Sequence, residues 1–173
     1  MDPQVPSATV VQPDELSLRE KEDVMGAWLM AFGALHLGLP IPFLGLAAAW
    51  IYHVVNAKKS VFTGFHCFQS FLLSVPISLL SAVWVVWGGV LFVWFLKGAV
   101  SAPPGGPYFW PYSLGCLAVY LAYLMACAVG AFRARKGRVV YFPWVGRWAF
   151  VRYFGASRRL PRPVEPNLPP RGM

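Results

Sequence analysis

The chain has 173 residues, of which 57% are hydrophobic and only 13% are charged, and its formal net charge is +8. So few polar side chains cannot cover the surface of one water-soluble globule, which excludes an ordinary soluble domain and makes a membrane protein the expected class. Three stretches, residues 24–57, 60–96 and 98–132, contain no charged residue. Each is longer than the roughly 20 residues with which a helix crosses a bilayer, so we expect a break in each of them.

Two prolines break the first uncharged stretch. Pro40 and Pro42 remove backbone donors and disfavour helical geometry in the residues before them, which predicts a tight hairpin of two short helices, residues 24–38 and 43–57. Helices this short would cross a thinned bilayer, borrow flanking residues, or enter the membrane as a wedge. The alternative is one long span that the prolines kink.

The other two stretches each predict one longer helix. Residues 60–67 are rich in Phe and are interpreted as an interfacial approach, followed by a helix over 68–95 that Pro76 kinks. The Gly- and Pro-rich residues after Lys97 predict a loop, and a last helix is expected over 111–132. The predicted fold is therefore an all-α integral membrane bundle of four helices, two short and two long.

Four segments follow from this interpretation. Residues 1–16 are expected to be a disordered tail, 17–138 the membrane helical domain, 139–157 a basic and aromatic interfacial segment, and 158–173 a second disordered tail. Ser17 and Glu20 have the spacing of a capping box, which predicts that a helix starts before the first uncharged stretch.

Orientation is predicted from Lys and Arg. In the hairpin topology Lys97 is the one Lys or Arg that lies on the opposite side from the others, which places both termini in the cytoplasm and the protein in the inner (plasma) membrane as a multi-pass protein. If residues 24–57 were a single span, the N-terminus would lie outside instead.

Basic residues mixed with aromatic ones follow the last predicted helix. This mixture suits an anionic cytoplasmic leaflet, where each Arg or Lys contributes about 1 kcal/mol. A nucleic-acid-binding arm is the rival interpretation, but the segment directly follows a membrane helix and no nucleic-acid fold motif is visible, so no nucleic-acid partner is expected. The residues predicted to contact lipid headgroups are Arg133, Arg135, Lys136, Arg138, Arg147 and Arg152.

Reactive groups are scarce. No Asp or Glu occurs from residue 24 to residue 164, which removes carboxylate acids, bases and metal ligands from that region. The three histidines lack a metal-binding spacing, and Cys67, Cys116 and Cys127 are interpreted as free thiols. We therefore expect no catalytic residue, no cofactor and no metal, and hence no enzyme.

Small and weakly polar residues recur at helical spacing. In lipid, close packing over small residues and interhelical hydrogen bonds drive helix association, so two such rows are expected to face each other or a shared groove. The alternative is that the second row lines a polar cavity for a solute. The rows are Ala118, Ala122, Ala126 and Gly130 on the last helix, and His66, Ser70, Ser74, Ser78 and Ala82 on the helix before it.

The order of segments adds a resemblance. Two short helices around an "IPF" turn, then "VFTGFHCFQSF" before a long helix and "AFRARKGRVVYFPW" after the last one, resemble a bacterial family of small membrane proteins, classed as a domain of unknown function. That family is similar to the four-helix subunit of the chloroplast inner-envelope protein translocon (Tic). The resemblance covers residues 25–148. It is carried by Phe68, Gln69, Arg135, Lys136, Gly137, Tyr141, Phe142 and Pro143.

Cys67 replaces the family's asparagine in this pattern. Two further departures accompany the resemblance: the acidic residues that precede the family's Phe-Gln pair are absent, and the loop over residues 97–107 is rich in Gly and Pro. The resemblance implies no enzymatic activity, because the family has no established chemistry. The expected function is a noncatalytic structural or accessory subunit of a membrane assembly, with a membrane-protein partner or a second copy as its neighbour. The alternative is a small channel or carrier with a Ser- and His-lined polar groove.

Overall fold

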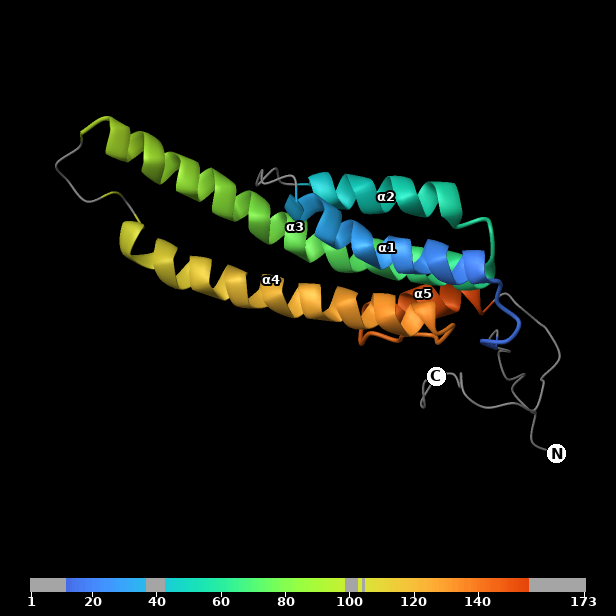
Figure 1. Ribbon diagram of the computed structural model, residues 1–173. Helices are drawn as coiled ribbons and strands as arrows, with labels where there is room; N and C mark the ends of the chain where they lie inside the picture. The colour runs from blue at the N-terminus through green and yellow to red at the C-terminus, as the bar shows by residue number, and fades with distance from the viewer. Residues whose placement is uncertain (1–11, 37–42, 99–102, 104, 156–173) are drawn as a thin grey trace.

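The computed structural model describes residues 12–36, 43–98, 103 and 105–155. Within these residues all regular structure is helical, as Figure 1 shows, and the predicted all-α class is confirmed. The five helices are α1 (Leu18–His36), α2 (Leu44–Asn56), α3 (Val61–Leu96), α4 (Gly106–Arg135) and α5 (Val145–Tyr153).

The predicted number of four helices is wrong: the described residues form five, because α5 lies in the segment interpreted as basic, aromatic and interfacial, and two of the five, not four, are long and apolar enough to span a membrane. Helix α5 has only nine residues and two arginines, so its apolar face is short and easily missed. Gly146, Ala149 and Phe150 form that face at positions i, i+3 and i+4, and all three are buried. Contact with α3, distant in sequence, stabilises this short helix.

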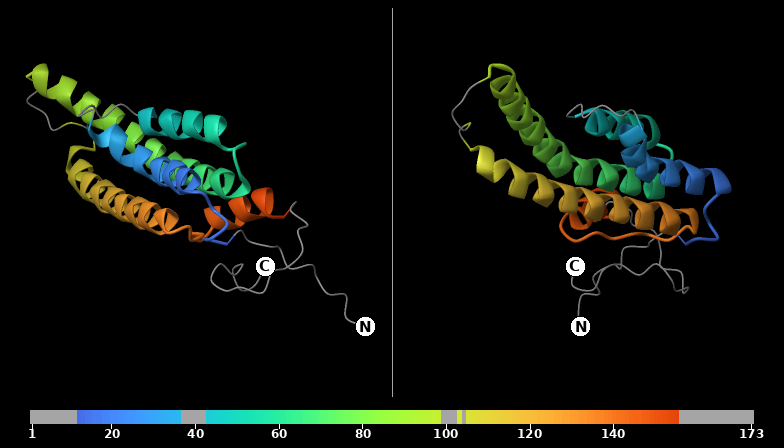
Figure 2. Two further views of the ribbon diagram at one scale, coloured as in Figure 1. Left: turned by 45° about the vertical axis from the view of Figure 1, so that its right-hand side comes forward. Right: turned by 60° about the vertical axis from the view of Figure 1, so that its left-hand side comes forward.

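Both long helices start earlier than predicted. Residues 61–67, interpreted as an interfacial approach, are the first turns of α3, and the Ser60 hydroxyl accepts a hydrogen bond of 3.1 Å from the Thr63 backbone N–H as the N-cap. In α4, Pro107 lies in the first turn, where a missing N–H costs nothing, so the helix begins at Gly106 rather than near Pro111. Pro76 lies inside α3, which continues through it and bends along its length (Figure 2).

The helices form a bundle of uneven depth (Figures 1 and 2). At one end, here called the near half, α1, α2, α5 and the end of α4 surround the first half of α3. At the other end, the far half, the described part of the chain contains only the second half of α3 and the first half of α4, which continue side by side. The start of α1, the turn between α2 and α3, and the end of α4 all lie at the near end. Pro40 and Pro42, the predicted hairpin turn, lie outside the described residues.

The core of the near half is built around aromatic side chains. Trp28 of α1 is fully buried against Phe62 of α3 and against Cys127 and Ala131 of α4. A second cluster joins Phe65 of α3 to the apolar face of α5 and to Phe154. Leu16, in the tail predicted to be disordered, is 7% exposed and belongs to the first cluster.

The far half instead exposes apolar side chains. Two of the described helices, α3 and α4, are long and apolar enough to span a membrane, and the most apolar 18-residue stretch of α3 has no buried residue. Helix α2 is also apolar, but its 13 residues are fewer than a spanning helix needs. Contacts between the two far halves are aromatic and polar: Trp84 Nε1 donates to Ser113 Oγ at 2.9 Å, and Tyr112 donates its hydroxyl to the Leu80 carbonyl at 3.1 Å.

The predicted capping box at the start of α1 is present. The Ser17 hydroxyl accepts from the Glu20 backbone N–H at 3.2 Å, while a Glu20 carboxylate oxygen accepts from the Ser17 backbone N–H at 2.9 Å. Burial acts to raise the pKa of Glu20, but the hydrogen bonds from the Ser17 backbone and hydroxyl outweigh it, so the pKa lies below its usual value.

Ser17→Ala is expected to reduce stability by about 1 kcal/mol at neutral pH, the usual cost of a lost N-cap. Because the folded-state pKa of Glu20 is lowered, the stabilisation is present above the unfolded-state pKa of 4.5 and is lost as the pH falls through the lower folded-state value. Denaturation midpoints of both proteins at pH 7 and near pH 3 measure this. An equal difference between the proteins at both pH values would contradict it.

Candidate functional site

Gln69 lies at the centre of a buried polar junction in the near half. Its side chain is fully buried, and with the amide oriented to satisfy both groups, its nitrogen donates to the Val140 carbonyl at 2.8 Å and its oxygen accepts from the Phe142 N–H at 2.8 Å. Residues 139–143 therefore run against α3 and are held by one side chain. Gly146 makes this possible, because a Cβ there would lie 3.0 Å from the Gln69 side-chain amide group and 2.9 Å from the Tyr141 ring.

His66 lies one turn earlier on α3 and completes the junction. The Trp28 indole Nε1–H donates to His66 Nδ1 at 3.3 Å, which assigns the ring proton of the neutral imidazole to Nε2. Nε2 has no hydrogen-bond partner among the described residues and is enclosed by aromatic side chains. The ring centres of Phe62 and Phe65 lie 4.6 and 5.0 Å from that of His66. This enclosure favours a structural role over proton transfer, because the His66 ring is fully buried.

The serine row of α3 continues from this junction along the same helix. Ser70, Ser74 and Ser78 are all buried. The Ser70 hydroxyl donates to the Ala27 carbonyl of α1 at 2.9 Å, and the Ser74 hydroxyl donates to the Phe71 carbonyl at 2.6 Å. These two hydroxyls therefore bond backbone acceptors, one of them across a helix interface.

The small-residue row of α4 changes face along the helix. A four-residue step turns about 40° further than a full turn, so three steps rotate the row by about 120°. Ala118 and Ala122 are exposed, Ala126 is half-buried, and Gly130 is buried. At Gly130 a Cβ would lie 2.6 Å from the Trp28 ring, so this glycine allows α1 and α4 to approach closely. The row of α3 and the row of α4 thus meet at Trp28 of α1, while the start of the α4 row faces outward.

A second contact holds α5 against α2 and α3. Tyr153 Oη lies 3.5 Å from His53 Nε2, and the Arg152 guanidinium lies 4.8 Å from the centre of the Phe68 ring. Close to the N-terminus of α3, Lys59 pairs with Asp23 of α1 at 2.7 Å. Such an exposed ion pair contributes little, so aromatic packing dominates this end of the molecule.

The basic residues predicted to contact lipid headgroups are all exposed at the near end of the bundle (Figure 1). Arg133 and Arg135 lie in the last turn of α4, and Lys136 and Arg138 follow it. Arg147 and Arg152 lie on α5, beside the exposed Trp148. Together they form a cationic and aromatic rim.

Groups that could hold a metal or act as nucleophiles are dispersed. No cluster of three His, Cys, Asp or Glu side chains exists within the part of the chain that the structure describes. Cys67 and Cys127 are buried and Cys116 is half-buried, and all three are free thiols. The side chain of His36 lies outside the described residues.

Gly64→Ala is expected to destabilise the near half by about 1–3 kcal/mol, the usual cost of overpacking. A Cβ at Gly64 would lie 2.8 Å from the Ala57 carbonyl oxygen and would also meet the Tyr153 ring, so α5 must shift. Gly89→Ala on the same helix is the matched control. It has no atom within 4 Å and is expected to stabilise the helix by about 0.5–1 kcal/mol. Detergent-unfolding midpoints compare the two variants, and equal effects would contradict the packing argument.

Sequence reasoning missed the main features of this junction. The contact between Gln69 and residues 140 and 142 joins segments far apart in the chain, and no local pattern encodes it. The one available signal was the resemblance, which singled out Gln69 and Phe142 without relating them. Comparison with protein-family models, with curated proteins and with solved structures finds no match to the chain.

Proposed function

We propose that this protein is a noncatalytic multi-pass membrane protein that serves as a structural or accessory subunit of a membrane assembly. The observation that carries the proposal is the combination of a sealed polar junction in the near half with an uncovered pair of apolar helices in the far half. A sealed junction fixes the arrangement of helices but admits no substrate. The uncovered helices need an apolar environment, which lipid and neighbouring helices supply.

Exposed small residues on α4 support a protein neighbour. Ala118 and Ala122 face away from the rest of the chain, next to Gly115, at which a Cβ would meet no atom within 4 Å. In a membrane, small residues on a helix face permit another backbone to approach closely, which is how helices associate there. This face is where a partner helix or a second copy would pack.

The orientation follows from the charges. The rim of Arg and Lys at the near end would lie at the cytoplasmic leaflet of the inner membrane, and Lys97 would lie at the opposite surface. The start of α1 and the end of α5 lie at the near end, so both termini would be cytoplasmic. A role related to protein translocation, as in the Tic-like family that the chain resembles, fits such a scaffold.

The alternative of a channel or carrier has less support. It needs hydroxyls that line an open path, whereas Ser70 and Ser74 donate to backbone carbonyls within a packed interface. Solute flux into liposomes that is lost on Ser74→Leu would establish it nevertheless.

A photo-crosslinking amino acid at Ala122 tests the subunit role in native membranes. The expected result is a defined protein adduct, identified by mass spectrometry as a partner or as a second copy. The same group at Ile51, on the outward apolar face of α2 and 62% exposed, is the control and is expected to capture lipid. Lipid capture alone at both positions would contradict the assembly role. Recovery of the chain in a detergent-free soluble fraction would contradict membrane insertion altogether.

A further inference from the structure

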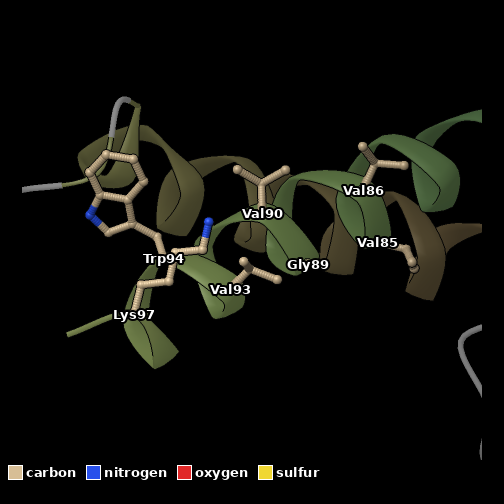
Figure 3. Close-up of a pocket in the computed structure, with 7 residues that line it drawn as sticks. All are labelled: Val85, Val86, Gly89, Val90, Val93, Trp94 and Lys97. Carbon is tan, nitrogen blue, oxygen red and sulfur yellow. The ribbon is translucent and has the colours of Figure 1, made fainter. Parts of the chain in front are cut away.

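The far half of α3 carries a groove on the face that turns away from α4. The groove has a volume of about 520 Å³ and is lined by valines around Gly89, with Trp94 and Lys97 at its outer end. Figure 3 shows the Lys97 side chain extending along the helix, so that its amino group lies near Trp94 and Val90. Gly89 lies in the open part of this groove, and a Cβ there would meet no atom within 4 Å.

This groove continues a face of α3 that α2 covers in the near half. Phe71 packs against Trp50 of α2 with ring centres 5.0 Å apart. Gly89 follows Phe71 by five turns of about 3.6 residues, so the two residues lie on the same side of α3. Because α2 extends along only the near half, none of the described helices covers this face beyond it (Figure 1).

The dimensions of the groove match one lipid leaflet. From Val85 to Lys97 the helix rises by about 18 Å. Half of a hydrocarbon core is about 15 Å, so the valines would lie along an acyl chain while the backbone of Lys97 lies at the headgroup level, where its flexible side chain can meet a phosphate. Lys97 is the sole Lys or Arg in the sequence between residues 60 and 132.

The charge of Lys97 selects the occupant. Two copies of the chain inserted with the same orientation would meet at this face around an axis along the membrane normal, which brings the two Lys97 ammonium groups together and costs free energy. A phosphate carries the complementary charge. We propose that this groove binds one anionic phospholipid of the leaflet opposite the basic rim, with its phosphate on Lys97 and an acyl chain along Val86, Val90 and Val93. The proposal rests on the membrane-spanning role proposed above.

The test places a photo-crosslinking amino acid at Val90 in the full-length protein, reconstituted in vesicles of equal parts phosphatidylglycerol and phosphatidylcholine. Mass spectrometry then identifies the captured lipid. The expected result is about a fivefold preference for phosphatidylglycerol, which corresponds to one lysine near a headgroup, and loss of that preference on Lys97→Gln. Leu114 on α4, which is 66% exposed, is the control position and is expected to capture the two lipids in their bulk ratio.

Other outcomes separate the two proposals. Capture in the bulk ratio at both Val90 and Leu114 would overturn the lipid site while leaving membrane insertion intact. A crosslink between two copies at Val90 would overturn it in favour of a self-association face. A preference that persists in Lys97→Gln would overturn the role of this lysine. Failure of the protein to enter vesicles at all would instead overturn the membrane role on which the site depends.

Discussion

Gln69→Met is expected to lower the free energy of unfolding by about 2–4 kcal/mol, because it leaves two backbone groups at a buried junction without a partner. Methionine has nearly the shape of glutamine, so the change removes the hydrogen bonds to Val140 and Phe142 without opening a large cavity. The variant is also expected to expose α5, which follows directly after these residues. Trypsin cleavage after Arg147 and Arg152 measures that exposure.

Leu79→Met on the same helix is the matched control for this variant. Leu79 is 56% exposed and takes no part in the junction, so its replacement is expected to change stability by less than about 0.5 kcal/mol. Unfolding of both variants by increasing concentrations of a denaturing detergent gives their two unfolding midpoints under the same condition. If Gln69→Met and Leu79→Met had the same midpoint and the same cleavage rate, Gln69 would not hold residues 139–143 in place.

Trp28→Ala is expected to be at least as damaging, with a loss of about 3–5 kcal/mol. The indole is fully buried between α1, α3 and α4, and its removal opens a cavity next to Gly130 that the backbone cannot fill. It also leaves His66 Nδ1 without its donor. Denaturation of the purified protein measures the loss.

Trp28→Phe separates the contribution of the buried ring from that of the hydrogen bond to His66 Nδ1. Phenylalanine retains part of the ring contact but lacks the N–H, so this variant is expected to lie between Trp28→Ala and the natural protein. Trp148→Ala, at a tryptophan that is 70% exposed, is the control and is expected to change stability little. A result in which Trp148→Ala and Trp28→Ala were equally destabilising would contradict the central position of Trp28.

Local sequence signals predicted the start of α1 and the all-helical class. Ser17 and Glu20 predicted the start of α1 because a capping box depends only on neighbouring residues. The all-helical class followed from long apolar stretches. The start of α3 was predicted seven residues too late, because Phe62 and Phe65 have the composition of an interface, while their burial depends on Trp28 and on α5.

The candidate site was predicted only as a set of separate residues. His66, Ser70, Ser74 and Ser78 belong to one row and are all buried. The partners of that row come from Ala27 and Trp28, which no spacing rule connects to it. Helix geometry alone shows that residues spaced by four, from Ala118 to Gly130, do not stay on one face of α4. Which of them meets α1 depends on tertiary packing and could not be predicted from the sequence.

The contact between Gln69 and residues 140–142 has a consequence for biosynthesis. During translation, α3 leaves the ribosome well before residues 139–154, so the partners of its polar and aromatic face are complete only after α5 has been made. Until then the Gln69 amide of the nascent chain lacks both of its backbone partners, a state that would be costly in lipid. We therefore expect residues 139–154 to pack against α3 late in synthesis. A chain that stalls after α4 would leave Phe65 and Gln69 uncovered, and quality-control proteases can recognise such exposed buried residues.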